Sequence, residues 1–198
     1  PQEPYFRLFT EKGIAWSLEN GVLAVEGRLT PGVYALPGDV SSQFITGLLY
    51  ALPLLEGDSE LVLTTALESR GYVDMTLDAL AQFGVSAEYD GDRRFRVPGN
   101  QAYRHRDLAI EGDWSNAAFW LCAGAIATDP ITVEGVSLSS AQGDRNVLAA
   151  LSRFGARIVR STNAATVQSD KLAGFEMSAH DIPDLVPVIS AVASLAQG

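Results

Sequence analysis

The chain has 198 residues, of which 47% are hydrophobic and 19% are charged, so it can bury a core and does not have the composition of a disordered chain. The longest apolar run, residues 117–127, is too short to cross a membrane, and a single cysteine excludes a disulfide-stapled fold. The formal net charge of −10 disfavours nucleic acid and anionic membranes as partners, and the lack of a signal-peptide pattern favours the cytoplasm.

The first 27 residues are predicted to be the end of a repeated unit. Residues 6–10 are typical of the last turns of a helix, and Gly13 follows as its C-terminal cap. Residues 14–18 and 22–26 flank a short turn and predict a β-hairpin.

One complete unit follows this hairpin. Residues 38–42, with the sequence Gly-Asp-Val-Ser-Ser, come directly before an apolar helical stretch, and we expect a short strand ahead of them. The later elements of the unit are a strand, a helix and two strands joined by a turn. In order, the predicted elements after the first strand are 43–55, 60–65, 73–83, 85–89 and 94–97. The unit is therefore βαβαββ.

The same pattern recurs farther along the chain. The motif at 38–42 returns as Gly-Asp-Trp-Ser-Asn, 74 residues later. The apolar face and glycine cap of the helix over 73–83 return 71 residues later, as Leu148, Leu151, Phe154 and Gly155. The predicted elements of this second unit are 117–127, 131–134, 146–154, 156–160 and 166–169.

A third unit begins near the end of the chain. Residues 181–184 align with residues 39–42 and precede an apolar helix over 185–196. Because the chain starts and stops inside a unit, we expect it to be a piece of a longer repeat protein. The polar stretch 99–107 is expected to join two domains, residues 1–109 and 110–198. The predicted fold class is α/β, of the α+β type, with repeated βαβαββ units.

The standard catalytic motifs do not occur in the sequence. We find no dinucleotide-binding, P-loop, nucleophile-elbow or metal-ligand spacing. Cys122 lies in an apolar run and is interpreted as an inert core residue. His105 and His180 are interpreted as surface or structural side chains, and the arginines within 93–106 as the solvated face of a hairpin and its loop.

The helix starts are the best candidates for chemistry. Ser41 and Ser42 open the helix over 43–55, where a serine is a common N-cap. Two hydroxyls, free N–H groups and the helix dipole also form an anion site, to which Gln43 adds an amide. Asp184 aligns with Ser42, where a carboxylate either caps the helix or acts as a general base if the starts share one cleft. Capping and ligand binding both remain open for these residues.

Six segments in order give the chain a resemblance to the 5-enolpyruvylshikimate-3-phosphate (EPSP) synthase family. The first is Ser-Ser-Gln-Phe at 41–44 followed by Thr46, and the second is the Ser-x-x-Tyr-x-Asp pattern at 69–74. The other four are Phe83-Gly84-Val85, Glu111-Gly112-Asp113-x-Ser115, Gln142-Gly143-Asp144 and Ile182-Pro183-Asp184. The resemblance covers the chain from about residue 4.

The resemblance implies a fold and a reaction. The family has six βαβαββ units arranged as two lobes around a cleft, and this chain would contain parts of both lobes. The family transfers the enolpyruvyl group of phosphoenolpyruvate to the 5-hydroxyl of shikimate 3-phosphate and releases phosphate, a step of aromatic amino-acid biosynthesis. Neither a metal nor an organic cofactor is implied, and the two small-molecule substrates are the implied partners.

The resemblance also implies residue roles within the first predicted domain. Ser41 and Ser42 would hold the substrate phosphate, and Gln43 would lie between shikimate 3-phosphate and phosphoenolpyruvate. Ser69 and Tyr72 would contact shikimate 3-phosphate.

In the second predicted domain, the resemblance implies that Asp184 bonds the shikimate hydroxyls and takes part in proton transfer at the 5-hydroxyl. The family's N-terminal lysine, its Gly-Asn-Ala-Gly-Thr segment with the following arginine, and its Lys-Glu-x-x-Arg segment have no counterpart here. The isolated chain is therefore expected to lack turnover. Gly71 stands where the family's Ser-x-Pro-Tyr loop has proline.

Two other classes of protein stay open. Another member of the same fold group, such as an enolpyruvyl transferase acting on a nucleotide sugar or an RNA-terminal phosphate cyclase, would share the repeats. A cyclase would need a nucleotide site and a catalytic histidine. A non-catalytic repeat scaffold would keep the fold without the chemistry. The half-units at both ends predict uncovered faces and self-association.

Overall fold

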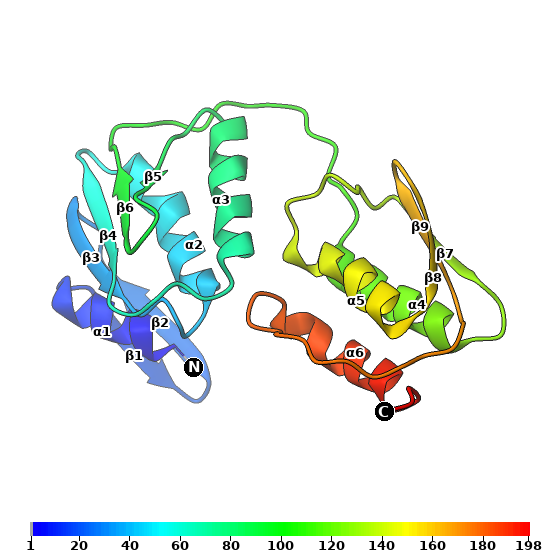
Figure 1. Cartoon of the computed structure of the whole chain (residues 1–198). Coiled ribbons are helices and arrows are strands. Elements are labelled where there is room, and N and C mark those ends of the chain that lie inside the picture. Colours follow the sequence, from blue (N-terminus) through cyan, green and yellow to red (C-terminus); the bar gives the residue numbers. More distant parts are fainter. Residues whose placement is uncertain (1) are drawn as a thin grey trace. The chain divides into compact units, whose positions relative to one another are not determined.

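The computed structural model describes residues 2–198, which form two compact units, one up to Asp107 and the other from Leu108 to Gly198 (Figure 1). Each unit has its own hydrophobic core. Residues 98–113 carry no helix or strand and include the expected junction. The first part of this stretch is held against the first unit, because the Asn100 N–H donates to the Leu55 carbonyl at 2.6 Å.

The first unit begins with a helix and a hairpin and continues with a complete βαβαββ sequence of elements. Its elements are α1 (Glu3–Glu11), β1 (Ala15–Glu19), β2 (Val22–Glu26), β3 (Gly32–Leu36), α2 (Ser42–Ala51), η1 (Leu52–Leu54), β4 (Ser59–Leu63), α3 (Arg70–Gln82), β5 (Glu88–Tyr89) and β6 (Arg94–Val97). Each predicted helix and strand of this unit is present; β2 and β6 have the predicted ends, and the other elements have shifted ends. The helix expected over 43–55 becomes a 3-10 turn after Ala51, where Pro53 removes a backbone donor.

A mixed four-stranded sheet lies at the centre of the first unit, in the order β3-β4-β6-β5. Strands β3 and β4 are parallel, while β6 is antiparallel to both β4 and β5. Helices α2 and α3 lie side by side on one face of this sheet (Figure 1). A parallel pair needs a crossover connection, and α2 supplies it between β3 and β4.

The core of the first unit follows the alternation of its strands. In β4 the residues at 59, 61 and 63 are buried and those between them are half-buried. The register places Leu61 opposite Tyr34 on one side and Phe95 on the other. These three side chains are fully buried and therefore share the sheet face that packs against the helices.

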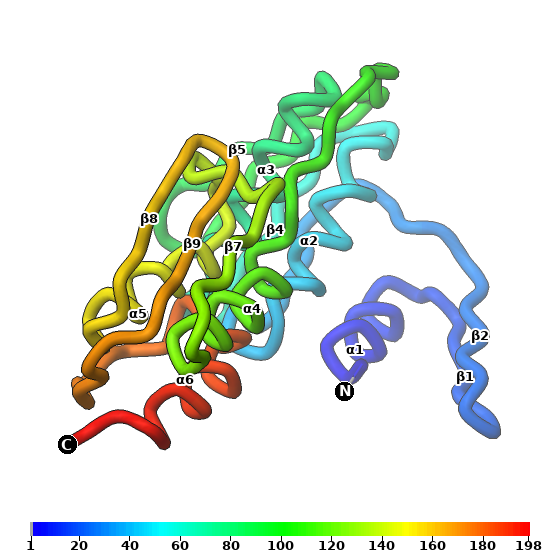
Figure 2. Tube along the Cα trace, turned by 90° about the vertical axis from the view of Figure 1, so that its right-hand side faces the viewer, coloured from blue at the N-terminus to red at the C-terminus, as the bar shows by residue number. Residues whose placement is uncertain are grey.

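Helix α1 joins the hairpin to the rest of the first unit (Figure 2). The Tyr5 hydroxyl donates to the Phe44 carbonyl of α2 at 2.9 Å, and the Phe6 ring stacks on Trp16 of β1 at 4.1 Å. The hairpin itself is a separate two-stranded sheet whose residues are all exposed. Its register puts Leu18 opposite Leu23, so one face of the hairpin is apolar and open to solvent.

The second unit packs three helices around an antiparallel three-stranded sheet in the order β7-β9-β8. Its elements are α4 (Trp114–Ile126), β7 (Ile131–Glu134), η2 (Gly143–Asn146), α5 (Val147–Phe154), β8 (Arg157–Ser161), β9 (Ala164–Gln168), η3 (Pro183–Leu185) and α6 (Val186–Ala193). Helix α4 is central, because it contacts β7, β9, α5 and α6.

Two predicted strands are absent from the second unit. The repeat pattern places a strand before α4 and another before α6, yet residues 108–112 and 174–179 form none. Ahead of α4, the Gly112 N–H donates to the Gly135 carbonyl at 2.9 Å, but no ladder follows. Ahead of α6, only an isolated bridge joins Ala173 to Gln197. A strand is stable only when its backbone groups are paired along its length, and these segments have no such pairing here.

The centre of α4 confirms the interpretation of Cys122 as a core residue. The thiol is 4% exposed, and burial raises its pKa to about 12, so it is protonated at neutral pH. Two positions after Cys122, only glycine fits, because a Cβ at Gly124 would lie 2.7 Å from the Val167 carbonyl oxygen. The helix can approach β9 this closely only with glycine there.

Asp113 caps the start of α4. Its carboxylate accepts hydrogen bonds from the Ser115 N–H at 2.8 Å and the Ser115 hydroxyl at 2.7 Å, and also from the Asn116 amide. Partial burial opposes ionisation, but these hydrogen bonds outweigh it and lower the pKa of Asp113 below its usual value.

Replacing Gly124 by alanine is expected to destabilise the second unit. Alanine favours a helix over glycine by about 1 kcal/mol, but the methyl group has no room against the Val167 carbonyl, and overpacking of this kind costs about 1–3 kcal/mol. The thermal midpoint of Gly124→Ala should therefore fall. A midpoint equal to or above that of the parent chain would contradict the close approach.

The cap at Asp113 predicts a pH-dependent stability. Because the folded-state pKa is lowered, the stabilisation is complete above the unfolded pKa, about 3.9, and is lost as the pH falls through the folded-state value. Asp113→Ala should cost about 1 kcal/mol at pH 7 and less at pH 3, as measured by urea unfolding. Asp129→Asn, an exposed carboxylate in the loop after α4, is the control and should show no such difference.

Candidate functional site

The two helix starts of the first unit lie at the same edge of the sheet. Helix α2 follows β3, and α3 follows β4. Since β3 and β4 are parallel, their carboxyl ends meet at one edge, and both helices begin there. The predicted site residues Ser41, Ser42, Gln43, Ser69 and Tyr72 all belong to these two starts.

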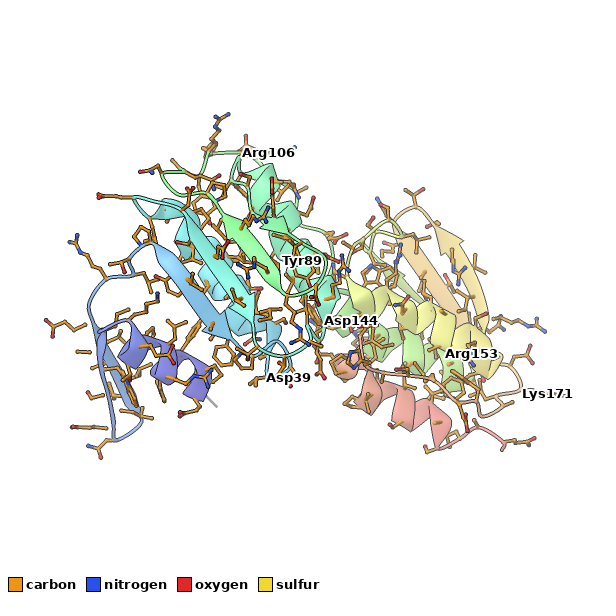
Figure 3. All side chains as sticks on the ribbon, turned by 60° about the vertical axis from the view of Figure 1, so that its left-hand side comes forward. Asp39, Tyr89, Arg106, Asp144, Arg153 and Lys171 are labelled. Atoms are coloured by element: carbon orange, nitrogen blue, oxygen red, sulfur yellow. The ribbon has the colours of Figure 1, made fainter. Side chains whose placement is uncertain are left out.

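Hydrogen bonds tie together the two loops that lead into these helices. The Thr65 hydroxyl donates to the Asp39 carboxylate at 2.7 Å and accepts from the Gly38 N–H at 2.9 Å. The Glu68 N–H donates to the Gly38 carbonyl at 3.0 Å. A Cβ at Gly38 would lie 2.7 Å from the Ala66 carbonyl oxygen, so glycine permits this approach. Figure 3 labels Asp39 in the loop that follows β3.

Ser41 caps helix α2. Its backbone is extended, and its hydroxyl oxygen accepts a hydrogen bond from the Gln43 N–H at 3.2 Å. The predicted capping role is therefore confirmed, while the hydroxyl hydrogen of Ser41 stays able to donate to a ligand. Ser42 is the first residue of the helix and is half-buried, and the Gln43 side chain is exposed. Donors therefore cluster at a positive helix end.

The start of α3 contains a strained residue. Ser69 has φ 53° and ψ 43°, a left-handed backbone that costs a non-glycine residue about 1–2 kcal/mol. The Tyr72 N–H donates to the Ser69 carbonyl at 3.1 Å. Between them, Arg70 pairs with Asp74 at 3.3 Å and lies over the Tyr89 ring at 5.5 Å from its centre. Arg70 therefore places a guanidinium group at this helix start, although it is not among the predicted site residues.

In the second unit, Gln142 joins two helix starts. Its side-chain amide donates to the Gly112 carbonyl and to the Glu111 carboxylate, both at 3.0 Å. Its amide oxygen accepts from the Trp114 N–H, the first donor of α4, at 2.8 Å. The buried Ser140 hydroxyl also donates to Glu111, at 2.6 Å. In the second unit the Gln142 side chain connects the loops that lead into two helices, whereas in the first unit the Thr65 side chain and backbone hydrogen bonds connect them.

The third start of the second unit lies beside these two. A Cβ at Gly143 would lie 3.2 Å from the Asp181 carbonyl oxygen, so the segment before α6 touches the segment before α5. Asp184 lies in η3, directly ahead of α6, and is exposed. Asp144, labelled in Figure 3, is a buried carboxylate in η2. Two carboxylates therefore lie at the ends of neighbouring elements.

The structure groups the predicted site residues by unit. Five of them share one edge of the first unit, and Asp184 lies among the helix starts of the second. Four further residues at these helix starts are not among the predicted site residues: Arg70, Glu111, Ser140 and Gln142. The repeat indicates the position of Ser140 and Gln142, since the 71-residue offset aligns the loop at 69–72 with 140–143.

The remaining candidates behave as surface groups. His105 and His180 are exposed, as the sequence analysis interpreted them. Across residues 2–198, no three His, Cys, Asp or Glu side chains are grouped so as to hold a metal ion. In the same range, no helix combines the length and apolar character that a membrane crossing requires.

Proteins of known activity are similar to this chain. It is 44% identical over 200 residues to the 3-phosphoshikimate 1-carboxyvinyltransferase of Clostridium kluyveri and 43% identical over 201 residues to that of Clostridium acetobutylicum. Both alignments cover 100% of this chain but only 47% and 46% of the relatives. The chain thus spans just under half the length of these curated relatives.

Solved structures confirm the predicted fold class. The enolpyruvyl transferase NikO from Streptomyces tendae superposes with a TM-score of 0.74 at 21% identity, covering 100% of this chain and 50% of that one. An EPSP synthase from Acinetobacter baumannii gives a TM-score of 0.73 at 22% identity, with 100% and 47% covered. Residues 4–198 also match the family model of EPSP synthase (3-phosphoshikimate 1-carboxyvinyltransferase). The resemblance found in the sequence is thereby confirmed, and the chain belongs to the EPSP synthase family.

Proposed function

We propose that this chain supplies part of an enzyme that transfers the enolpyruvyl group of phosphoenolpyruvate to the 5-hydroxyl of shikimate 3-phosphate, releasing phosphate. The proposal includes a cytoplasmic location. The observation that carries it is the pair of helix starts at one edge of the first unit, in a chain of this family. Residues 1–109 are assigned to one lobe and residues 110–198 to the other.

The first unit is assigned the recognition of shikimate 3-phosphate. A phosphate placed at the start of α2 would meet the positive helix end and the hydroxyls of Ser41 and Ser42. Ser69 would bring a third hydroxyl from the neighbouring helix start. Donation from backbone and hydroxyl groups lets an acidic chain hold an anion with few cations, and Arg70, which pairs with Asp74, brings a guanidinium group to the same helix start.

Gln43 and Tyr72 are assigned further contacts with the substrates. Gln43 is exposed at the first turn of α2, so its amide can donate to one substrate and accept from the other. This fits a position between shikimate 3-phosphate and phosphoenolpyruvate. Tyr72 lies in the first turn of α3 and is assigned to shikimate 3-phosphate together with Ser69.

The second unit is assigned the proton chemistry. In the reaction, a bond forms between the 5-oxygen and the enolpyruvyl carbon, the bond from that carbon to the phosphate oxygen breaks, and the hydroxyl proton must leave. Asp184 is exposed in the turn directly ahead of α6. We assign it to bond the shikimate hydroxyls and to accept that proton.

The catalytic assignment is tested in a hybrid in which residues 2–198 replace the matching region of the Clostridium kluyveri relative. Phosphate release from both substrates is measured, with the far-ultraviolet circular dichroism spectrum and the thermal midpoint as the checks on folding. Asp184→Asn should lower kcat by about 10²-fold or more, because a general base contributes on that scale. Asp181→Asn, an exposed carboxylate three residues away, should change kcat by less than about threefold. A hybrid whose kcat is unaffected by Asp184→Asn would contradict the assignment.

Self-association is proposed for the isolated chain. The hairpin of β1 and β2 presents an apolar face on which Leu18 is 52% exposed, and a two-stranded sheet has unpaired edges. Light scattering at high concentration should give a mass above 21.1 kDa. Leu18→Lys should reduce that mass toward the monomer, whereas Val159→Lys, on exposed β8, should not. A monodisperse monomer at every concentration would rule the proposal out.

A further inference from the structure

Two threonine hydroxyls connect the helices that carry the predicted site. The Thr46 oxygen on α2 lies 2.8 Å from the Thr76 oxygen on α3. Thr46 is half-buried, and Thr76 is only 4% exposed. Thr76 is also one of the few buried polar residues in a core that is otherwise apolar. A buried hydroxyl of this kind needs hydrogen-bond partners, and here it has two.

The direction of these bonds follows from the number of hydrogens. The Thr76 hydroxyl donates its single hydrogen to the Tyr72 carbonyl at 2.9 Å. The bond to Thr46 must then run the other way, with Thr46 as the donor. A continuous chain of bonds therefore leads from α2 through Thr76 to the backbone of Tyr72.

Both threonines lie one helical turn after a predicted substrate-binding residue. Thr46 comes four residues after Ser42, and Thr76 comes four residues after Tyr72, so each lies beneath a predicted substrate-binding residue. The backbone of Ser69 next to this turn is left-handed and strained, so it needs fixed surroundings to persist. The hydroxyl bridge adds a polar link between the two helices to the hydrogen bond that the Glu68 N–H makes to the Gly38 carbonyl beside Ser69.

Packing alone does not require hydroxyls at these positions. The repeat offsets align Thr46 with Trp120 and Thr76 with Val147 in the second unit. Val147 is fully buried and apolar, while Trp120 is 64% exposed. Helices α4 and α5 are nevertheless in contact. The second unit therefore joins its matching helices without such a bridge.

We propose that Thr46 and Thr76 are positioning residues that fix Tyr72 and Ser69 relative to Ser42 for recognition of shikimate 3-phosphate. The proposal rests on the proposed function for the identity of the ligand. Its structural half, that the bridge immobilises the start of α3, does not depend on any ligand.

The structural half is tested by amide hydrogen exchange on the full chain. Thr76→Val keeps the shape of the side chain but removes both bonds, and amides in the first two turns of α3 should exchange about tenfold faster. Thr76→Ser should restore the parent rate. Thr166→Val is the matched control, because it removes the equally short hydroxyl pair with Thr132 between β7 and β9, at 2.8 Å. It should leave α3 unchanged.

The functional half is tested by titrating the same variants with shikimate 3-phosphate in a calorimeter. Thr76→Val should weaken binding about fivefold, with recovery in Thr76→Ser and no change in Thr166→Val. Unchanged exchange in Thr76→Val would overturn the inference, and so would faster exchange with unchanged affinity. A parent chain that binds no shikimate 3-phosphate would instead count against the proposed recognition of this substrate by the first unit, while the exchange rates still decide whether the bridge positions α3.

Discussion

The parallel pairing of β3 and β4 is the constraint on which the first unit depends. Two parallel neighbours must be connected by a crossover, so the chain passes along a helix before the second strand begins. Both helices that follow these strands then start at the same edge. Residues near 41 and near 70 meet there although almost thirty positions separate them. The backbone topology brings the hydroxyls together, and the hydrogen bonds among Gly38, Asp39 and Thr65 set the fine spacing.

The second unit also brings its helix starts together, but without a parallel pair of strands. Its described sheet contains no parallel pair, because the strand expected ahead of α4 does not form. The helix starts are instead joined by Gln142 and Glu111, and by the close contact at Gly143. The repeated sequence motifs therefore specify the positions of helix starts more strongly than they specify how those starts are held. The capping residue also differs, because Ser41 caps α2 whereas Asp113, two positions earlier in the repeat, caps α4.

Much of this fold could be predicted from the sequence because the repeat and the hydrophobic periodicity agreed. The hairpin at the start, α3 and the strands β6 and β7 lie close to their predicted places. The strands predicted ahead of α4 and α6 do not form, because a strand depends on a partner elsewhere in the chain, which local pattern does not reveal. Among site residues, the serines were found because capping has a clear local signature. Gln142 and Thr76 were not, since their importance comes from bonds to residues 28 and 30 positions away in sequence.

The protonated, buried state of Cys122 has a practical consequence. A thiol with a pKa of about 12 does not react appreciably with maleimides at neutral pH, and this chain has no other cysteine. A pair of cysteines introduced on the surface, one in each unit, would therefore be the only groups to take up spin labels or fluorophores. The distance between the units could then be measured in solution on a chain that keeps its native sulfur.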